Sequence, residues 1–244
     1  MRSSWLFVVL ALAGIPQSNA QRPPSRAEPV YIYASQRGTP TLDEGEGGGN
    51  PFASALVDLL GQETLTFDSL LGELVRLTEA KSSGFQRPDV HVLRKLDRWQ
   101  IAPLPDGESR IALVLVYSDY SAMEGGKSLP GAKRDTERIA AALERVGFLV
   151  IKVLDADEQT REAALRTFEI RSNSSEVALI YTTGHGVGVG RDVYLLPGTY
   201  PLSRGASALK ENAVPLTALA ARLQARRVNL ILYGGCRDNP FSSR

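Results

Sequence analysis

The sequence predicts an α/β protein built on a mostly parallel sheet, and two observations lead to that prediction. From Arg110 onward, apolar strand-like runs alternate with helical stretches, which is typical of parallel strands joined by right-handed crossovers. The strand-like runs are also continuously apolar, as expected for strands buried on both faces. We expect strands at 111–116, 149–154, 177–182, 193–196 and 228–233, and helices at 133–146, 160–171 and 215–226.

The residues before Arg110 predict two strands and two helices. Residues 30–34 are β-branched and aromatic and predict a short strand, and residues 88–93 predict another. The pair Asn50-Pro51 predicts a helix start, with asparagine as the N-cap and proline in the first turn. Apolar residues at helical spacing continue this helix and predict a second one: Phe52, Leu56, Leu59 and Leu60, then Phe67, Leu70, Leu71, Leu74 and Val75.

The first twenty residues have the features of a secretory signal peptide. A basic Arg2 precedes an apolar run over 5–13, and the small residues Ser18 and Ala20 occupy the positions that a signal peptidase reads. The alternative is a membrane anchor, but the run is well short of the about 20 residues that span a bilayer. We therefore expect a cleaved signal over 1–20, a Pro-rich linker over 21–29, an exported protein, periplasmic or secreted, and one domain over 30–244.

Composition excludes several other classes of function. The net charge is +1 and no basic cluster stands out, so neither nucleic acid nor a membrane is indicated as a partner. One cysteine and two distant histidines, His91 and His185, argue against a zinc site, and we expect no metal and no other cofactor. Alternating glycines over 184–190 miss the spacing of a dinucleotide-binding loop and precede a strand-like segment instead of a helix. We expect His91 to be structural and the protein to be a monomer.

The only cysteine and one histidine follow two of the predicted strands. His185 follows the strand 177–182 after Thr183 and Gly184, and Cys236 follows the strand 228–233 after two glycines. Active sites of open α/β sheets lie beyond the carboxyl ends of the strands, so these side chains are expected to meet there. Such a pair is typical of cysteine hydrolases. The alternatives are a loop histidine without a task and a cysteine that acts as a small buried hydrophobe.

Four further motifs lie between residues 110 and 241: Leu-Pro-Gly-Ala-Lys-Arg-Asp at 129–135, Gly-His-Gly at 184–186, Tyr-Leu-Leu-Pro at 194–197 and Cys-Arg-Asp-Asn-Pro-Phe at 236–241. With these motifs, the segment resembles the large catalytic subunit of the caspase-like cysteine peptidases, which include caspases, metacaspases and bacterial orthocaspases. Before the cysteine, where the family often has Asp-Ala or Gln-Ala, this chain has Gly234-Gly235. The resemblance implies a three-layer α/β/α sandwich with a mostly parallel sheet of about six strands.

The order of the segments indicates a circular permutation. Residues 30–93 resemble the small subunit, which in this family normally follows the catalytic cysteine, and here they precede it. We interpret 30–93 as small-subunit-like, 94–109 as a connector and 110–244 as the catalytic part. Many caspases must be cut between the two subunits, and that segment would begin just past Phe241, whereas this chain ends at Arg244. We therefore expect activity without internal processing.

The resemblance implies thiolate attack by Cys236 on a peptide or protein substrate, with His185 as the acid and base. The backbone N–H groups of Gly186 and Cys236 would form the oxyanion hole. No third, orienting residue can be read from the sequence, and in this family a dyad suffices. The alternative is an inactive or weakly active caspase-like binding module, because Gly234-Gly235 replaces the usual residues beside the nucleophile.

Three acidic residues are candidates for the S1 pocket, which binds P1, the substrate residue before the cleaved bond. By resemblance to metacaspases Asp135 would point into S1, and Asp43 and Glu44 fall about where animal caspases have an S1 arginine. An acidic pocket favours arginine or lysine at P1. The alternatives are that Asp135 stabilises a helix dipole and that Asp43 and Glu44 belong to a solvated loop.

Overall fold

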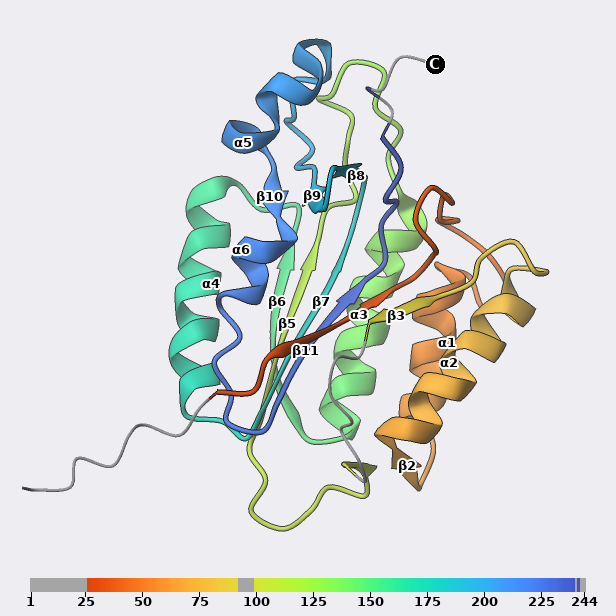
Figure 1. Ribbon diagram of the computed structural model, residues 1–244, viewed down its shortest axis with the longest axis vertical. Helices are drawn as coiled ribbons and strands as arrows, with labels where there is room; N and C mark the ends of the chain where they lie inside the picture. Colours follow the sequence, from red (N-terminus) through yellow and green to blue (C-terminus); the bar gives the residue numbers. More distant parts are fainter. Residues whose placement is uncertain (1–25, 92–98, 240, 242–244) are drawn as a thin grey trace, which may run out of the picture.

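The computed structural model describes residues 26–91, 99–239 and 241 (Figure 1). The predicted signal peptide, most of the predicted linker and the His91 side chain lie outside the described part of the chain. In the described part, none of the helices combines the length and the apolar character needed to cross a membrane.

A six-stranded sheet forms the centre of the fold, with the strand order β3-β1-β11-β7-β5-β6. Its strands are β1 (Pro29–Tyr33), β3 (Asp89–His91), β5 (Arg110–Val116), β6 (Phe148–Leu154), β7 (Val177–Thr183) and β11 (Val228–Tyr233). Only β3 is antiparallel to its neighbour. Strands β5, β7 and β11 are buried along their whole length, as their continuously apolar sequences predict, whereas the edge strand β6 is partly exposed.

Helices cover both faces of this sheet and complete the predicted three-layer sandwich (Figure 1). On one face lie α1 (Pro51–Leu60), α2 (Phe67–Lys81) and α3 (Pro130–Arg145), and on the other lie α4 (Glu158–Asn173) and α6 (Leu216–Ala220). Each strand sends alternate side chains into two separate cores. In β5, Val114 packs in the core beneath α1 and α3, and Leu113 packs in the core beneath α4. The predicted fold class is confirmed.

The helix starts near the site follow local sequence signals. The Asn50 side chain accepts a hydrogen bond of 2.8 Å from the Phe52 N–H and so caps α1, with Pro51 in the first turn. Thr66 caps α2 through a reciprocal pair of hydrogen bonds with Ser69. These caps satisfy N–H groups that have no partner inside their own helix.

The segment 94–109, interpreted from the sequence as a connector, contains a strand that the sequence pattern did not predict. This strand is β4 (Gln100–Ala102), which pairs with β2 (Leu65–Thr66) in a small separate sheet. The buried Arg110 guanidinium donates 2.7 and 2.9 Å hydrogen bonds to the Ile101 and Gln100 carbonyls and forms an ion pair with Glu108. A buried cation that needs carbonyl partners thus fixes this segment in an extended conformation.

The predicted helix over 215–226 was also wrong in extent, because α6 ends at Ala220. Beyond it, the Gln224 N–H donates to Ser172 Oγ at 2.6 Å and the Ala225 N–H donates to Asn229 Oδ1 at 3.0 Å. Tertiary partners therefore take the backbone donors that a longer helix would use. Before α6 the chain forms a 3₁₀-helix (Leu202–Ala208), α5 (Leu209–Asn212) and β10 (Val214–Pro215), none of which the sequence pattern predicted.

The first strand of the described chain lies beside the last. β1 is parallel to β11 with Tyr33 opposite Tyr233, and the Ala34 N–H donates to the Tyr233 carbonyl at 2.8 Å. The carboxyl ends of β1, β11 and β7 therefore meet at one edge of the sheet (Figure 1). The loop that follows β1 is carried to the same edge as Cys236.

Candidate active site

His185 and Cys236 line one pocket of about 70 Å³ at the carboxyl ends of β7 and β11. The strand ends contribute one wall, and the loop after β1 together with the start of α3 contributes the opposite one. The other lining residues are Thr41, Leu42, Asp43, Asn50, Leu129, Ala132, Thr183, Gly184 and Gly234. The structure thus brings together the two side chains that the sequence placed at strand ends.

The Cys236 side chain is a free thiol in contact with the loop after β1. The residue is only partly buried, so its sulfur is not sealed inside a core. The Thr41 N–H donates to Cys236 Sγ at 3.2 Å, and the Thr41 hydroxyl oxygen lies 3.3 Å from the same sulfur. A residue far away in sequence therefore fixes the thiol position, and no sequence motif indicated Thr41.

The His185 ring is oriented by a backbone carbonyl. Its Nε2 lies 2.7 Å from the Lys127 carbonyl oxygen, and a carbonyl can only accept, so Nε2 carries the hydrogen. In the neutral ring Nδ1 is then the atom able to accept a proton. The His185 N–H also donates to the Tyr120 hydroxyl at 2.7 Å, and the two rings are 4.3 Å apart between centroids. The Tyr120 hydroxyl in turn donates to the Leu196 carbonyl at 2.9 Å.

Two glycines allow β8 (Gly186–Val189) to lie directly against the loop of Cys236. A Cβ atom added at Gly186 would lie 1.7 Å from Tyr233 Oη and 2.6 Å from the Cys236 carbonyl oxygen. At Gly188 it would lie 2.4 Å from the Arg237 carbonyl oxygen, and the Gly188 N–H donates to the Asp238 carbonyl at 3.0 Å. Both positions therefore require glycine for steric reasons.

The glycine just before Cys236 is also required by close contacts. A Cβ atom at Gly235 would lie 2.6 Å from the Gly184 carbonyl oxygen and 2.6 Å from Tyr233 Oη. The Tyr233 hydroxyl donates to the Cys236 carbonyl at 3.1 Å and occupies the space beneath this turn. The departure from the usual family residue at position 235 thus accompanies a tyrosine that fills the same region.

Arg237, the residue after Cys236, links the Cys236 loop to β1 and β3. The buried Arg237 guanidinium forms an ion pair with Asp89 on β3 at 2.7 Å and donates to the Ser35 carbonyl. It also lies 3.9 Å from the centroid of the Tyr33 ring. These contacts link Cys236 to β1 and β3, which belong to the other half of the chain.

The three acidic residues predicted for S1 differ in their position relative to the pocket. Asp43 lines the pocket, and its carboxylate accepts hydrogen bonds from the Gly131 and Ala132 N–H groups at 2.9 and 2.8 Å, at the start of α3. Asp135 is fully buried behind that wall and is not among the lining residues. Glu44 is exposed, forms an ion pair with Arg134 and does not line the pocket.

The Asp135 carboxylate is satisfied by two donors. It accepts hydrogen bonds of 2.8 Å from the Asn50 N–H and 2.8 Å from the Arg138 guanidinium. Removal from water outweighs these favourable contacts and raises the pKa of Asp135 to about 6. The group therefore remains negatively charged at neutral pH and places charge directly behind the pocket wall.

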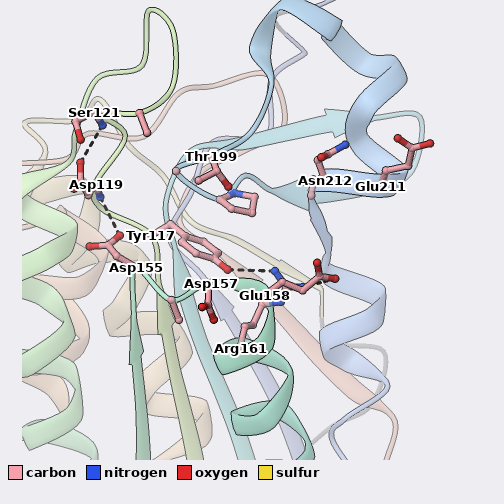
Figure 2. Close-up of a pocket in the computed structure, with 15 residues that line it drawn as sticks. Tyr117, Asp119, Ser121, Asp155, Asp157, Glu158, Arg161, Thr199, Glu211 and Asn212 are labelled. Carbon is pink, nitrogen blue, oxygen red and sulfur yellow. Dashed lines mark hydrogen bonds and ion pairs between the residues drawn. The ribbon is translucent and has the colours of Figure 1, made fainter.

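A larger cavity of about 370 Å³ lies beyond the ends of β5 and β6 (Figure 2). Its lining includes five carboxylates and Arg161, which lies 3.4 Å from the Tyr117 hydroxyl. Asp155 is already bound by the Ser118 N–H at 2.6 Å. The lining contains neither histidine nor cysteine, and in the described part of the chain no group of acidic, cysteine and histidine residues could hold a metal. The smaller pocket is therefore the candidate active site.

Comparison with known proteins assigns the chain to a family. A search of curated proteins found no match to this sequence. A family model of the caspase domain, peptidase family C14, matches residues 109–243, which is more than half of the chain and contains both His185 and Cys236. The resemblance found in the sequence is thus confirmed at the family level, and the chain belongs to the caspase-domain family of cysteine peptidases.

Proposed function

We propose that the protein is a cysteine endopeptidase in which Cys236 and His185 form the catalytic dyad. The observation that carries this proposal is that both side chains line one pocket while the Lys127 carbonyl fixes the protonated nitrogen of His185. His185 Nδ1 takes the thiol proton, and Cys236 Sγ attacks the carbonyl carbon of the scissile peptide bond. The imidazolium then protonates the leaving amine, and water hydrolyses the thioester and restores the thiol.

The oxyanion formed in this reaction would be bound by the backbone N–H groups of Gly186 and Cys236. The close approach of β8 to the Cys236 loop supports this assignment, since glycine at 186 lets backbone donors come near the reacting carbonyl. Such preorganised donors stabilise charge that develops only in the transition state.

We propose a preference for arginine or lysine at P1. Asp43 lines the pocket, Asp135 lies behind it, and none of the lining residues is a lysine or an arginine. A cationic P1 side chain would therefore enter a pocket lined by the Asp43 carboxylate and by no lysine or arginine, while Asp135 behind the wall is paired with Arg138. Glu44 points into solvent and is assigned no direct contact with P1.

The permuted arrangement and activity without internal cutting are part of the same proposal. In the uncut chain, β1 already pairs with β11, and Thr41 and Asn50 already line the pocket with Cys236. The small-subunit-like half thus contributes to the site through contacts that need no free chain end. Export of the protein is proposed on the sequence features of residues 1–20 alone.

The test is hydrolysis of a P1-varied set of fluorogenic peptides by protein purified from about residue 21 onward. We expect cleavage after arginine and lysine, none by Cys236→Ala, and a loss of at least about 10²-fold in His185→Ala, the usual contribution of a positioned acid and base. A folded wild-type protein that cleaves no peptide would favour the binding-module alternative. Intact mass is followed in parallel, and a lag that ends when an internal cut appears would contradict activity without processing.

A further inference from the structure

Strand β7 carries two hydroxyl groups toward the wall of the catalytic pocket. Thr183 lines that pocket, and Tyr181, two residues earlier, points to the same face of the strand. Tyr181 is fully buried, and its Oη forms no hydrogen bond within the described part of the chain. The proposed mechanism does not use either hydroxyl.

The position of Gly234 shows how close both hydroxyls lie to the pocket. Gly234 lines the pocket, and a Cβ atom added there would lie 2.7 Å from Thr183 Oγ1 and 3.4 Å from Tyr181 Oη. Thr183 thus occupies the space that a side chain at 234 would need, and Tyr181 Oη lies next to it. At position 234, two residues before Cys236, the pocket wall is therefore formed by Thr183 in place of a side chain, and the Tyr181 hydroxyl lies directly behind it.

The Tyr181 hydroxyl makes no hydrogen bond that would explain it as a structural group. A buried hydroxyl without a partner lowers stability, whereas phenylalanine would fill the same space without that cost. Burial raises the pKa of Tyr181, and the carboxylates of Asp135 and Asp43 raise it further, so the phenol remains neutral. A neutral hydroxyl in the electrostatic field of these two carboxylates can accept an N–H from a cation that the carboxylates attract.

We propose that Tyr181 is a specificity-determining residue whose hydroxyl, together with that of Thr183, accepts N–H groups from a P1 arginine or lysine. The carboxylates supply the attraction for the cation, and the hydroxyls supply acceptors at a defined position. The inference rests on the proposed peptidase function. It extends that function by assigning acceptors for the P1 cation to β7, whose hydroxyls the proposed mechanism does not use.

The experiment compares Tyr181→Phe with the wild type on peptides that have arginine, lysine or norleucine at P1. A hydrogen bond to a charged group typically contributes enough to lower kcat/KM by about 10-fold or more when it is lost. We expect that loss for arginine and lysine and no loss for norleucine. Because the hydroxyl has no partner in the free protein, the Tm of Tyr181→Phe should equal or exceed that of the wild type.

Tyr200→Phe is the matched control, since the buried Tyr200 hydroxyl donates to the Gly205 carbonyl at 2.6 Å. It should lower Tm and leave the arginine-to-norleucine ratio of kcat/KM unchanged. The inference is overturned if Tyr181→Phe lowers Tm as Tyr200→Phe does, or if its arginine-to-norleucine ratio equals that of the wild type. If the wild type cleaves no peptide, the proposed function fails and the inference fails with it. If the wild type cleaves after arginine and Tyr181→Phe does so equally well, only the inference fails.

Discussion

The buried carboxylate of Asp135 makes the stability of this fold depend on pH. Burial raises its pKa from 3.8 to about 6. The folded state therefore keeps a proton on Asp135 over a pH range in which the unfolded chain has lost it. The stability linked to this proton is fully present below pH 4 and is lost as the pH rises through 6. At about 1.4 kcal/mol per pKa unit, the rise in the pKa of Asp135 from 3.8 to about 6 corresponds to about 3 kcal/mol of unfolding free energy.

Asp135→Asn tests this reasoning because asparagine has the same shape and no proton to lose. Its side-chain oxygen can still accept from the Asn50 N–H, and the loss of charge opposite Arg138 affects all pH values in a similar way. Relative to the wild type, the variant should gain about 3 kcal/mol of unfolding free energy between about pH 4 and 7. Urea unfolding at several pH values and constant ionic strength measures the difference.

Asp119 provides a control of opposite sign. Hydrogen bonds from Ser121 lower the pKa of this exposed carboxylate, so its contribution is present above its unfolded pKa and lost as the pH falls. Asp119→Asn should therefore lose stability relative to the wild type as the pH rises. A difference between Asp135→Asn and the wild type that stays constant from pH 4 to 7 would refute the assignment of Asp135 as a desolvated carboxylate.

Three further substitutions test the geometry of the site. Gly186→Ala should lower kcat/KM by at least about 10²-fold, because its Cβ would lie 2.6 Å from the Cys236 carbonyl oxygen and displace the nucleophile loop; activity near the wild-type level would contradict the close packing. Tyr120→Phe should lower both kcat and unfolding free energy, the latter by about 1–3 kcal/mol, since the His185 N–H loses its acceptor; unchanged urea unfolding would argue against that bond. Glu44→Gln should change unfolding free energy by at most about 1 kcal/mol and leave P1 preference as it is, because its ion pair is exposed; a lost preference for arginine would place Glu44 in S1.

Much of the fold could be predicted because its signals are local. The continuously apolar β5, β7 and β11 are buried as expected, and Asn50 caps α1 through its own side chain. The extent of α6 could not be predicted, since Ser172 and Asn229 take its backbone donors from outside the helix. Strand β8 was missed because it contains alternating glycines, which rarely favour strands and are needed here for contact with the Cys236 loop.

The shared pocket of His185 and Cys236, the proposed catalytic pair, could be predicted from their place at strand ends, but the surroundings of the two side chains could not. Lys127 orients His185 through a backbone carbonyl, which any residue could supply. Thr41 contacts Cys236 only because β1 pairs with β11. Tyr181 belongs to an apolar strand whose pattern predicts burial and gives no indication that its hydroxyl lacks a partner. Residues that act through backbone atoms or long-range packing leave no motif.

The most direct test of the central claim is to locate and time the covalent reaction of the protein with a peptide that ends in an arginyl acyloxymethyl ketone. Mass spectrometry should find a single adduct on Cys236, because its thiol lines the pocket that we propose to bind a cationic P1 side chain. In His185→Ala the reaction should slow by at least about 10²-fold, since no base accepts the thiol proton. A folded protein whose Cys236 stays unmodified, or reacts equally fast with and without His185, would contradict the proposed dyad.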